Sequence, residues 1–519
     1  MPFFFEEERP VSTKIVRNVA FGVLRILLVA PVPFLLTPLI LHKVGTRGYG
    51  TWAVLVAINN LTSLADLGLL GTLSKYVSEY YAKRDFLTLN RLVGTGLALF
   101  GLLGVLVVSL LWVASPKLSV WLFRGSTNEP AELLGLFHCL LILVGLNILT
   151  FPFSSVTSGL QRLDLTNLLA SVNVICGAVF GASLLILGRG VRGLLYGSMF
   201  SAGITLVLYV WISRRLLPQV GFNPLHADPK EARKIFRFSL QIYVTQGAVA
   251  IHNQIEKLFL ALFSGVVAAG WYDIASDIAV KIRNVPGLLL SPILPAASEL
   301  DARGDQKKLE ELYYRAHKYL AFIGIPLVFY VVAVSRRFVE LWIGPNLSVV
   351  AIPFGILLLV NLFNLTTGPG FMILAGQGFL RPGVCSALVG IGLNVPLSFA
   401  LIYFYGFGGA VLGTCISLVT ASAFFLYLFH RHTQNSIARL LREAYFKPVV
   451  SSAFLLILMF VISPAAGLSW FGLFLHGCVF AIFYTMLLLF TKFFDRYDWL
   501  KAESVLPIAR IARRFVPVA

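Results

Sequence analysis

Residues 89–113 read LNRLVGTGLALFGLLGVLVVSLLWV, a run of 25 residues whose single charge, Arg91, stands near its start. A helix rises 1.5 Å per residue, so about 20 mostly apolar residues cross the roughly 30 Å hydrocarbon core of a bilayer. A surface helix of a soluble protein would keep a polar face along such a length. The stretch therefore predicts a membrane-spanning helix.

Similar runs occur throughout the chain of 519 residues, which is 58% hydrophobic and only 13% charged. Soluble domains carry about 25% charged residues, so the apolar excess here must face lipid. We expect an all-α polytopic membrane protein. Its fourteen predicted spans are 18–41, 49–73, 89–113, 132–156, 165–187, 191–213, 238–263, 266–294, 316–335, 348–375, 382–404, 407–429, 448–465 and 468–491.

The basic residues divide unequally between the predicted loops. With the N-terminus inside, about 30 fall in cytoplasmic segments and about 8 in external loops, as the positive-inside rule requires. We therefore expect both termini in the cytoplasm, and we interpret the net charge of +18 as a topology signal rather than a nucleic-acid partner.

The loops and motifs argue against an enzyme. No predicted loop exceeds about 25 residues, too few for a soluble catalytic domain. No Walker A pattern is present, which disfavours ATP as a direct energy source. The five cysteines lie in apolar runs without a C-x-x-C pair, so neither a metal site nor a disulfide framework is predicted.

The chain repeats itself at a shift of 220 residues. Apolar matches would arise by chance, but matched glycines and a Ser-Glu pair with a downstream Asp would not. The main matches are Gly45 with Gly265, Gly50 with Gly270, Ser78-Glu79 with Ser298-Glu299, and Asp85 with Asp305. At a shift of 216, Gly190, Gly193 and Gly197 match Gly406, Gly409 and Gly413.

This repeat predicts the domain organisation. The shift spans six helices, so the halves have equal orientation and surround a central cavity, a recurring transporter architecture. We expect six-helix lobes at residues 1–225 and 226–440, followed by a two-helix unit with a basic cytoplasmic tail at 441–519.

Several short motifs resemble the polysaccharide flippase family, part of the multidrug/oligosaccharidyl-lipid/polysaccharide transporter superfamily. They are Val44-Gly45-Thr46-Arg47-Gly48-Tyr49-Gly50-Thr51-Trp52-Ala53, Asp66-Leu67-Gly68, Gly159-Leu160-Gln161-Arg162, Ala297-Ser298-Glu299-Leu300 with Gly304-Asp305, and Leu341-Trp342-Ile343-Gly344. The resemblance implies a prokaryotic cytoplasmic membrane and a polyprenyl-(pyro)phosphate oligosaccharide, flipped to the outer leaflet by alternating access. Glycan-assembly enzymes are further expected partners.

Charged side chains inside spans are costly and are functional hypotheses by default. The predicted cationic set is Arg25, Lys257, Lys281 and Arg283. Such cations suit a (pyro)phosphate headgroup, because arginine offers a bidentate fork and lysine a point charge. For Arg25 the structural alternative is snorkelling to the inner headgroups, and for Lys281 it is a self-neutralising pair with Asp277 that serves packing.

Other polar residues are predicted to line the same cavity. Asp273, Asp277, Lys281 and Asn284 recur at helical spacing along one face, and the remaining members are Asn59, Asp66, Gln246 and Asn253. Asp66 is either a coupling-ion ligand or the partner of an arginine. Pro31, Pro33 and Pro38 follow Arg25 and predict a hinge.

No cofactor is expected, and a coupling ion (H⁺ or Na⁺) or the membrane potential remains open as the driving force. An inside-negative potential of about 100 mV favours outward movement of two negative charges by roughly 4–5 kcal/mol. The alternative function is an ion-coupled multidrug antiporter of the same superfamily. Such a protein would carry cations, so acidic residues should dominate its cavity.

Overall fold

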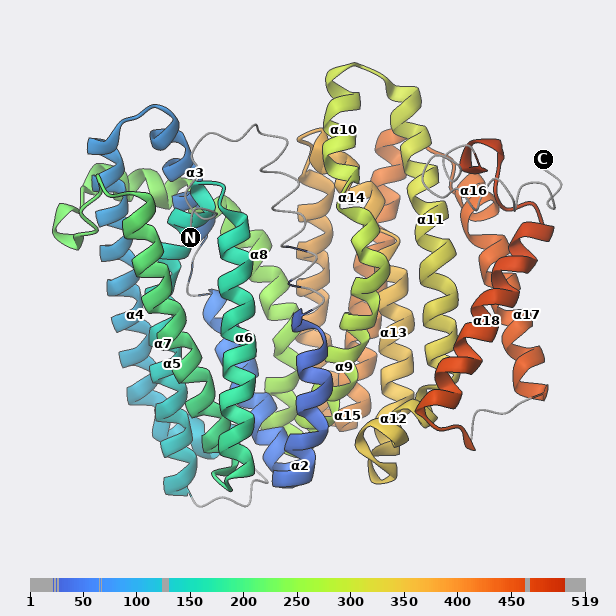
Figure 1. The fold of residues 1–519 in the computed structure, drawn as a ribbon, viewed down its shortest axis with the longest axis horizontal. Helices are drawn as coiled ribbons and strands as arrows, with labels where there is room; N and C mark the ends of the chain where they lie inside the picture. The colour runs from blue at the N-terminus through green and yellow to red at the C-terminus, as the bar shows by residue number, and fades with distance from the viewer. Residues whose placement is uncertain are drawn as a thin grey trace. The chain divides into compact units, whose positions relative to one another are not determined.

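The computed structural model describes residues 22, 25, 28–64, 66, 68–123, 130–462 and 467–499 (Figure 1). Every regular element within these ranges is helical and none is a strand, which confirms the predicted all-α fold. The long helices are α2 (Pro31–Asn60), α3 (Leu69–Ala82), α4 (Phe86–Leu122), α5 (Pro130–Gly159), α6 (Leu163–Ile186), α7 (Gly190–Leu216), α8 (Pro229–Ser264), α9 (Val266–Gly287), α10 (Ile293–Ala302), α11 (Gln306–Ala333), α13 (Ala351–Leu365), α15 (Arg381–Thr433), α17 (Phe446–Ile462) and α18 (Trp470–Phe490).

The shorter elements connect these helices. They are η2 (Leu61–Leu64), η3 (Pro224–His226), η4 (Leu288–Leu290), α12 (Ser335–Ile343), η5 (Pro345–Val350), α14 (Gly368–Gly376), α16 (Ile437–Leu440) and the π-helical turn η6 (Leu441–Tyr445).

Nine helical stretches of the described chain are long and apolar enough to cross a membrane. The run at 89–113 lies in α4, where Leu106 and Val113 are 62% and 82% exposed, as lipid-facing side chains should be. One of the nine, α15, covers two predicted spans that meet at Gly406, where the backbone leaves helical geometry. The protein is therefore a multi-pass membrane protein.

The chain forms two compact units. Unit 1 comprises residues 1–273 with 398–410, and unit 2 comprises 274–397 with 411–519. The lobes predicted at 1–225 and 226–440, and the terminal unit at 441–519, stay predictions. Each unit is described separately below.

In unit 1, glycine allows helices to approach closely. A Cβ on Gly50 of α2 would lie 2.0 Å from the carbonyl oxygen of Val266 at the start of α9. A Cβ on Gly270 would lie 2.9 Å from the Cα of Gly50. Both positions therefore need glycine, and they are the same two glycines that the repeat matches.

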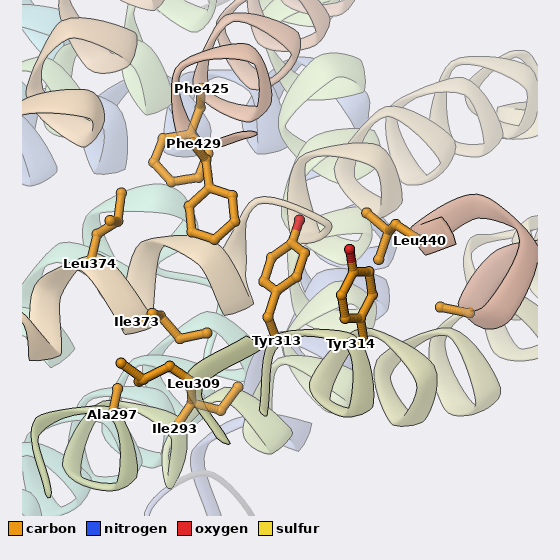
Figure 2. Close-up of a cluster of buried hydrophobic side chains, with 11 residues drawn as sticks. Ile293, Ala297, Leu309, Tyr313, Tyr314, Ile373, Leu374, Phe425, Phe429 and Leu440 are labelled. Atoms are coloured by element: carbon orange, nitrogen blue, oxygen red, sulfur yellow. The ribbon is translucent and has the colours of Figure 1, made fainter. Parts of the chain in front are cut away.

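Unit 2 has a buried core at one end of α11, shown in Figure 2. Tyr313 of α11 stacks on Phe429 of α15 with ring centroids 4.6 Å apart, and Ile373 and Leu374 of α14 line the same cluster. Further along α11, Tyr330 packs against the two C-terminal helices, α17 and α18. The last two helices are thus anchored on α11 by apolar contacts.

The repeat is visible in local backbone geometry. Asp85 caps α4 and Asp305 caps α11, with φ/ψ of −86°/76° and −87°/75°. Each carboxylate accepts a hydrogen bond from the backbone N–H three residues on, at 3.0 and 3.1 Å. The matched glycines agree as well, since Gly45 and Gly265 both have positive φ, 68° and 85°. The 220-residue repeat is therefore confirmed at the level of its turns.

Candidate functional site

A buried ion pair marks unit 1. Lys257 of α8 is only 6% exposed, and its Nζ lies 2.6 Å from Oδ1 of Asp273 on α9. The hydroxyl of Tyr49 on α2 donates to the other carboxylate oxygen of Asp273 at 2.8 Å. Two predicted site residues therefore meet, and the carboxylate offsets the charge of the lysine. The close approach at Gly50 brings the adjacent Tyr49 to this pair.

Arg25 is exposed, and its contact among the described residues is with an amide and not with a carboxylate. Its Nη1 donates to Oδ1 of Asn167 on α6 at 3.3 Å. Pro31 and Pro33 lie in the first turn of α2, and Pro38 lies inside that helix. The backbone of α2 leaves helical geometry at Gly45 (φ 68°), within the loop predicted between the first two spans. The hinge role of the prolines stays a prediction.

Two further predicted residues of unit 1 have hydrogen-bond partners. Asn59 accepts a hydrogen bond from the side chain of Asn147 on α5 at 3.0 Å. Asp66 is buried, and its carboxylate accepts the backbone N–H of Leu70 at 2.6 Å, at the start of α3. Among the described residues no ion pair to an arginine is found for Asp66, whereas this local capping contact is present.

In unit 2, Asp277 and Lys281 of α9 form an ion pair one helical turn apart. Their side chains are 42% and 26% exposed, and Asn284 on the next turn is exposed. The two charges of this pair neutralise each other, and both side chains are partly exposed to solvent. Its desolvation cost is therefore lower than that of the Lys257–Asp273 pair.

Arg283 has a different environment. Its Nη1 donates to Oδ1 of Asn364 at 3.0 Å and reaches Oδ1 of Asn361 at 3.4 Å, both on α13. Asn364 is itself oriented by a hydrogen bond to Ser422 of α15 at 3.0 Å. The Nε of Arg283 is buried without a hydrogen-bond partner in the described part of the chain. In the described part of the chain, Arg283 is thus held by neutral amides and not by a carboxylate.

Sequence reasoning missed several of these partners. The contacts of Tyr49, Asn167, Asn361 and Asn364 became visible only when distant helices were brought together. The side chains of Gln246 and Asn253, by contrast, lie outside the described residues. No group of three metal-ligating side chains occurs in the part of the chain that the structure describes.

Helices that cross a membrane and hold ion pairs and amide-bound cations within their length are typical of membrane transport proteins. Comparison with solved structures shows which known proteins share this fold. The fold resembles a lipid II flippase MurJ in an inward closed conformation (TM-score 0.69, 15% identity, covering 92% of this chain and 97% of that one). It also resembles an inward-facing multidrug resistance MATE family transporter (TM-score 0.62, 16% identity, 78% and 95% covered).

Sequence comparison gives the family. Residues 15–301, more than half of the chain, match the model of the polysaccharide biosynthesis protein family, and the chain belongs to that family. The lipid II flippase MurJ of Bacillus subtilis (strain 168) is 21% identical over 430 residues, covering 75% of this chain and 77% of MurJ. The predicted polysaccharide family is therefore confirmed, and the protein is a transport protein rather than an enzyme.

Proposed function

We propose that this protein flips a polyprenyl-(pyro)phosphate-linked oligosaccharide from the cytoplasmic to the outer leaflet of a prokaryotic cytoplasmic membrane by alternating access. The observation that carries the proposal is which partners the four predicted cations contact. Arg25 and Arg283 contact neutral amides, whereas Lys257 and Lys281 are paired with carboxylates. Family membership and the likeness to a lipid II flippase support the same class of cargo.

The chemistry follows from those partners. An amide oxygen orients a guanidinium without cancelling its charge, so the group remains able to bind an anion. In a low-dielectric setting a phosphate gains charge-assisted hydrogen bonds from such an arginine. Neutral polar groups such as Asn59 suit the hydroxyls of a sugar.

The driving force belongs to the same proposal. A headgroup with two negative charges is pushed outward by an inside-negative potential, and the arginines offset part of that energy. A coupling ion, H⁺ or Na⁺, is the other source of drive, with the buried Asp66 as its candidate ligand. We also propose that both termini lie in the cytoplasm and that glycan-assembly enzymes act as partners.

An ion-coupled multidrug antiporter is the second candidate. The structural likeness to a multidrug resistance transporter and the buried carboxylate of Asp66 favour it. Its cargo would be cationic, so removing Arg25 should leave efflux unchanged.

The test is translocation in liposomes. Purified protein is reconstituted and the flipping of a short-chain polyprenyl-pyrophosphate oligosaccharide is measured for the wild type and for Arg25→Gln. The matched control is Arg336→Gln, whose side chain is 82% exposed and pairs locally with Glu340. We expect protein-dependent flipping that Arg25→Gln lowers by about tenfold, the scale of one lost charge-assisted contact, and that the control retains.

Two outcomes would contradict the proposal. Equal flipping by Arg25→Gln and the wild type would remove the role of that cation. Absence of flipping, combined with proton- or sodium-driven efflux of a cationic dye, would favour the antiporter. Dissipating the membrane potential during the same assay tests the electrical drive, because flipping should slow if the potential contributes.

A further inference from the structure

Unit 2 contains a cavity of about 680 Å³ at one end of α11, between α16, the π-helical turn η6 and the segment that follows α18. Its wall is rich in charge. The basic residues are Lys307, Arg315, Lys318, Arg439, Arg442, Lys447 and Lys492, and the acidic ones are Glu310, Glu311, Glu443 and Asp495. None of these residues belongs to the predicted transport set.

The carboxylates of the wall are already engaged. Arg439 pairs with Glu310 at 2.9 Å and with Glu443 at 3.0 Å. Arg315 pairs with Glu311 at 2.7 Å and with Asp495 at 3.2 Å. The acidic residues therefore neutralise Arg439 and Arg315, and these ion pairs link the segments that form the wall.

Other cations of the wall remain uncompensated. Among the described residues, Lys307, Arg442 and Lys492 have no carboxylate partner within ion-pair distance. In the described part of the chain, Lys447 donates to the backbone carbonyl oxygens of Thr491 and Lys492, at 2.7 and 2.9 Å, and to no carboxylate. The seven basic residues of the wall thus outnumber its four acidic ones, and an excess of positive charge around a cavity is the arrangement that binds phosphate oxygens.

The backbone that carries these cations is irregular. Arg442 lies on the π-helical turn Leu441–Tyr445, and such turns are rare and frequently occur at functional sites. Lys492 has a φ of 53°, which is uncommon for a residue other than glycine. Both residues line the cavity.

The surroundings favour an amphiphile over a free ion. Helices α11 and α18 and the stretch Ile437–Val461 are candidate membrane spans, so the cavity lies where spans end and lipid headgroups begin. Large apolar side chains stand exposed beside the cationic residues in the chain, with Phe446 at 64% and Phe490 at 71%. A lipid headgroup lies at this level of the membrane, within reach of the cations in the cavity wall.

We propose that this cavity binds the phosphate headgroup of an anionic membrane lipid, which fastens the C-terminal helices α17 and α18 to α11. The inference goes beyond the proposed function, because the site shares no residue with the transport set. The test of this site measures lipid binding and not transport. Its result therefore does not depend on which cargo the transporter carries.

The experiment is a titration of the purified full-length protein in neutral detergent, followed by thermal melting. The probes are dioctanoyl phosphatidylglycerol, dioctanoyl phosphatidylcholine and inorganic pyrophosphate. The test variant is Arg442→Gln with Lys492→Gln, and the matched control is Lys308→Gln with Arg431→Gln, two exposed cations of unit 2 outside the cavity.

We expect phosphatidylglycerol to raise the melting temperature of the wild type and the control. We expect its apparent Kd to increase about tenfold or more in the test variant, since each basic residue near an anionic surface contributes about 1 kcal/mol. Equal affinity in the wild type and the test variant would overturn the proposal. Pyrophosphate binding as tight as that of phosphatidylglycerol would also overturn it, in favour of a soluble anion.

A second variant keeps the test decisive if the double substitution prevents folding. Lys307→Gln changes an exposed position in the first turn of α11, and Lys308→Gln is its neighbouring control. Loss of about fivefold in affinity in the first and not in the second is expected. No difference between the two would argue against the site.

Discussion

Lys257 in unit 1 and Arg283 in unit 2 are both cations within helices, yet their surroundings differ. Lys257 is buried against a carboxylate that a tyrosine also contacts. Arg283 is held by two asparagines and retains a buried N–H without a partner in the described chain. The carboxylate neutralises the charge of Lys257, whereas the asparagines orient Arg283 without neutralising it. A charge within a span therefore indicates function only when its partners are known.

The largest expected effect is on stability, at the ion pair. Lys257→Met leaves the carboxylate of Asp273, whose side chain is only 14% exposed, without this cation, which should lower the free energy of unfolding by about 3 kcal/mol. Adding Asp273→Asn removes the stranded charge and should restore most of the loss. Thermal melting of the single and double variants measures both effects.

The control for that comparison is Lys281→Met. Its ion pair with Asp277 is partly exposed, so its loss should cost less than about 1 kcal/mol. A cost equal to that of Lys257→Met would mean that burial does not distinguish the two pairs.

The next effect concerns transport at Arg283. Arg283→Ala removes a positive charge that its amide partners do not neutralise and that we propose binds the phosphate. The flipping rate should therefore fall by about 30-fold, equivalent to roughly 2 kcal/mol. Arg283→Lys should recover part of the rate, because it restores the charge without the fork. The liposome assay measures the rate, and melting temperature checks the fold.

Lys281→Ala sharpens this second prediction, because that lysine is already neutralised by Asp277. Its flipping rate should change by less than about threefold. Equal losses at Lys281 and Arg283 would show that counter-charges do not decide which cation binds the cargo.

A smaller effect is expected at Gly50, whose close contact brings Tyr49 to Asp273. Gly50→Ala places a Cβ 2.0 Å from the carbonyl oxygen of Val266, so α2 must move away from α9. Overpacking of this kind costs about 1–3 kcal/mol. The control is Gly101→Ala on α4, where no atom lies within 4 Å of the added Cβ. Comparable melting temperatures for the two variants would refute the close approach.

The smallest effect is a pH dependence in unit 2. Partial burial opposes the charge of Asp495, but the backbone N–H of Asp498 and the cations Lys318 and Arg315 outweigh burial and lower the pKa of Asp495. Because its folded pKa lies below the unfolded value of about 3.9, its stabilisation is present above that pH and is lost as the pH falls through the folded pKa.

Melting temperature should therefore be steady from pH 7 to 5 and decline below about pH 4. In Asp495→Asn the decline should be shallower. An unchanged profile would mean that the ion pairs at this carboxylate contribute nothing to stability.

Much of the fold could be predicted from the sequence, because lipid imposes long apolar helices that are visible as runs such as 89–113. The repeat was equally accessible, since Asp85 and Asp305 occupy equivalent helix caps that depend on local sequence. Helical spacing also paired Asp277 with Lys281, four residues apart. These features are determined within one or two helical turns.

The partners of the charges were decided by tertiary structure. Asp273 belongs by spacing to the same stripe as Asp277 and Lys281, yet it pairs with Lys257 of another helix and with Tyr49, 224 positions away in the sequence. Likewise, nothing around Arg283 indicates Asn361 or Asn364. A sequence determines which residues a helix presents along its length, because that follows from local geometry. Which charges meet depends on helix packing, since only packing brings distant side chains within hydrogen-bond distance.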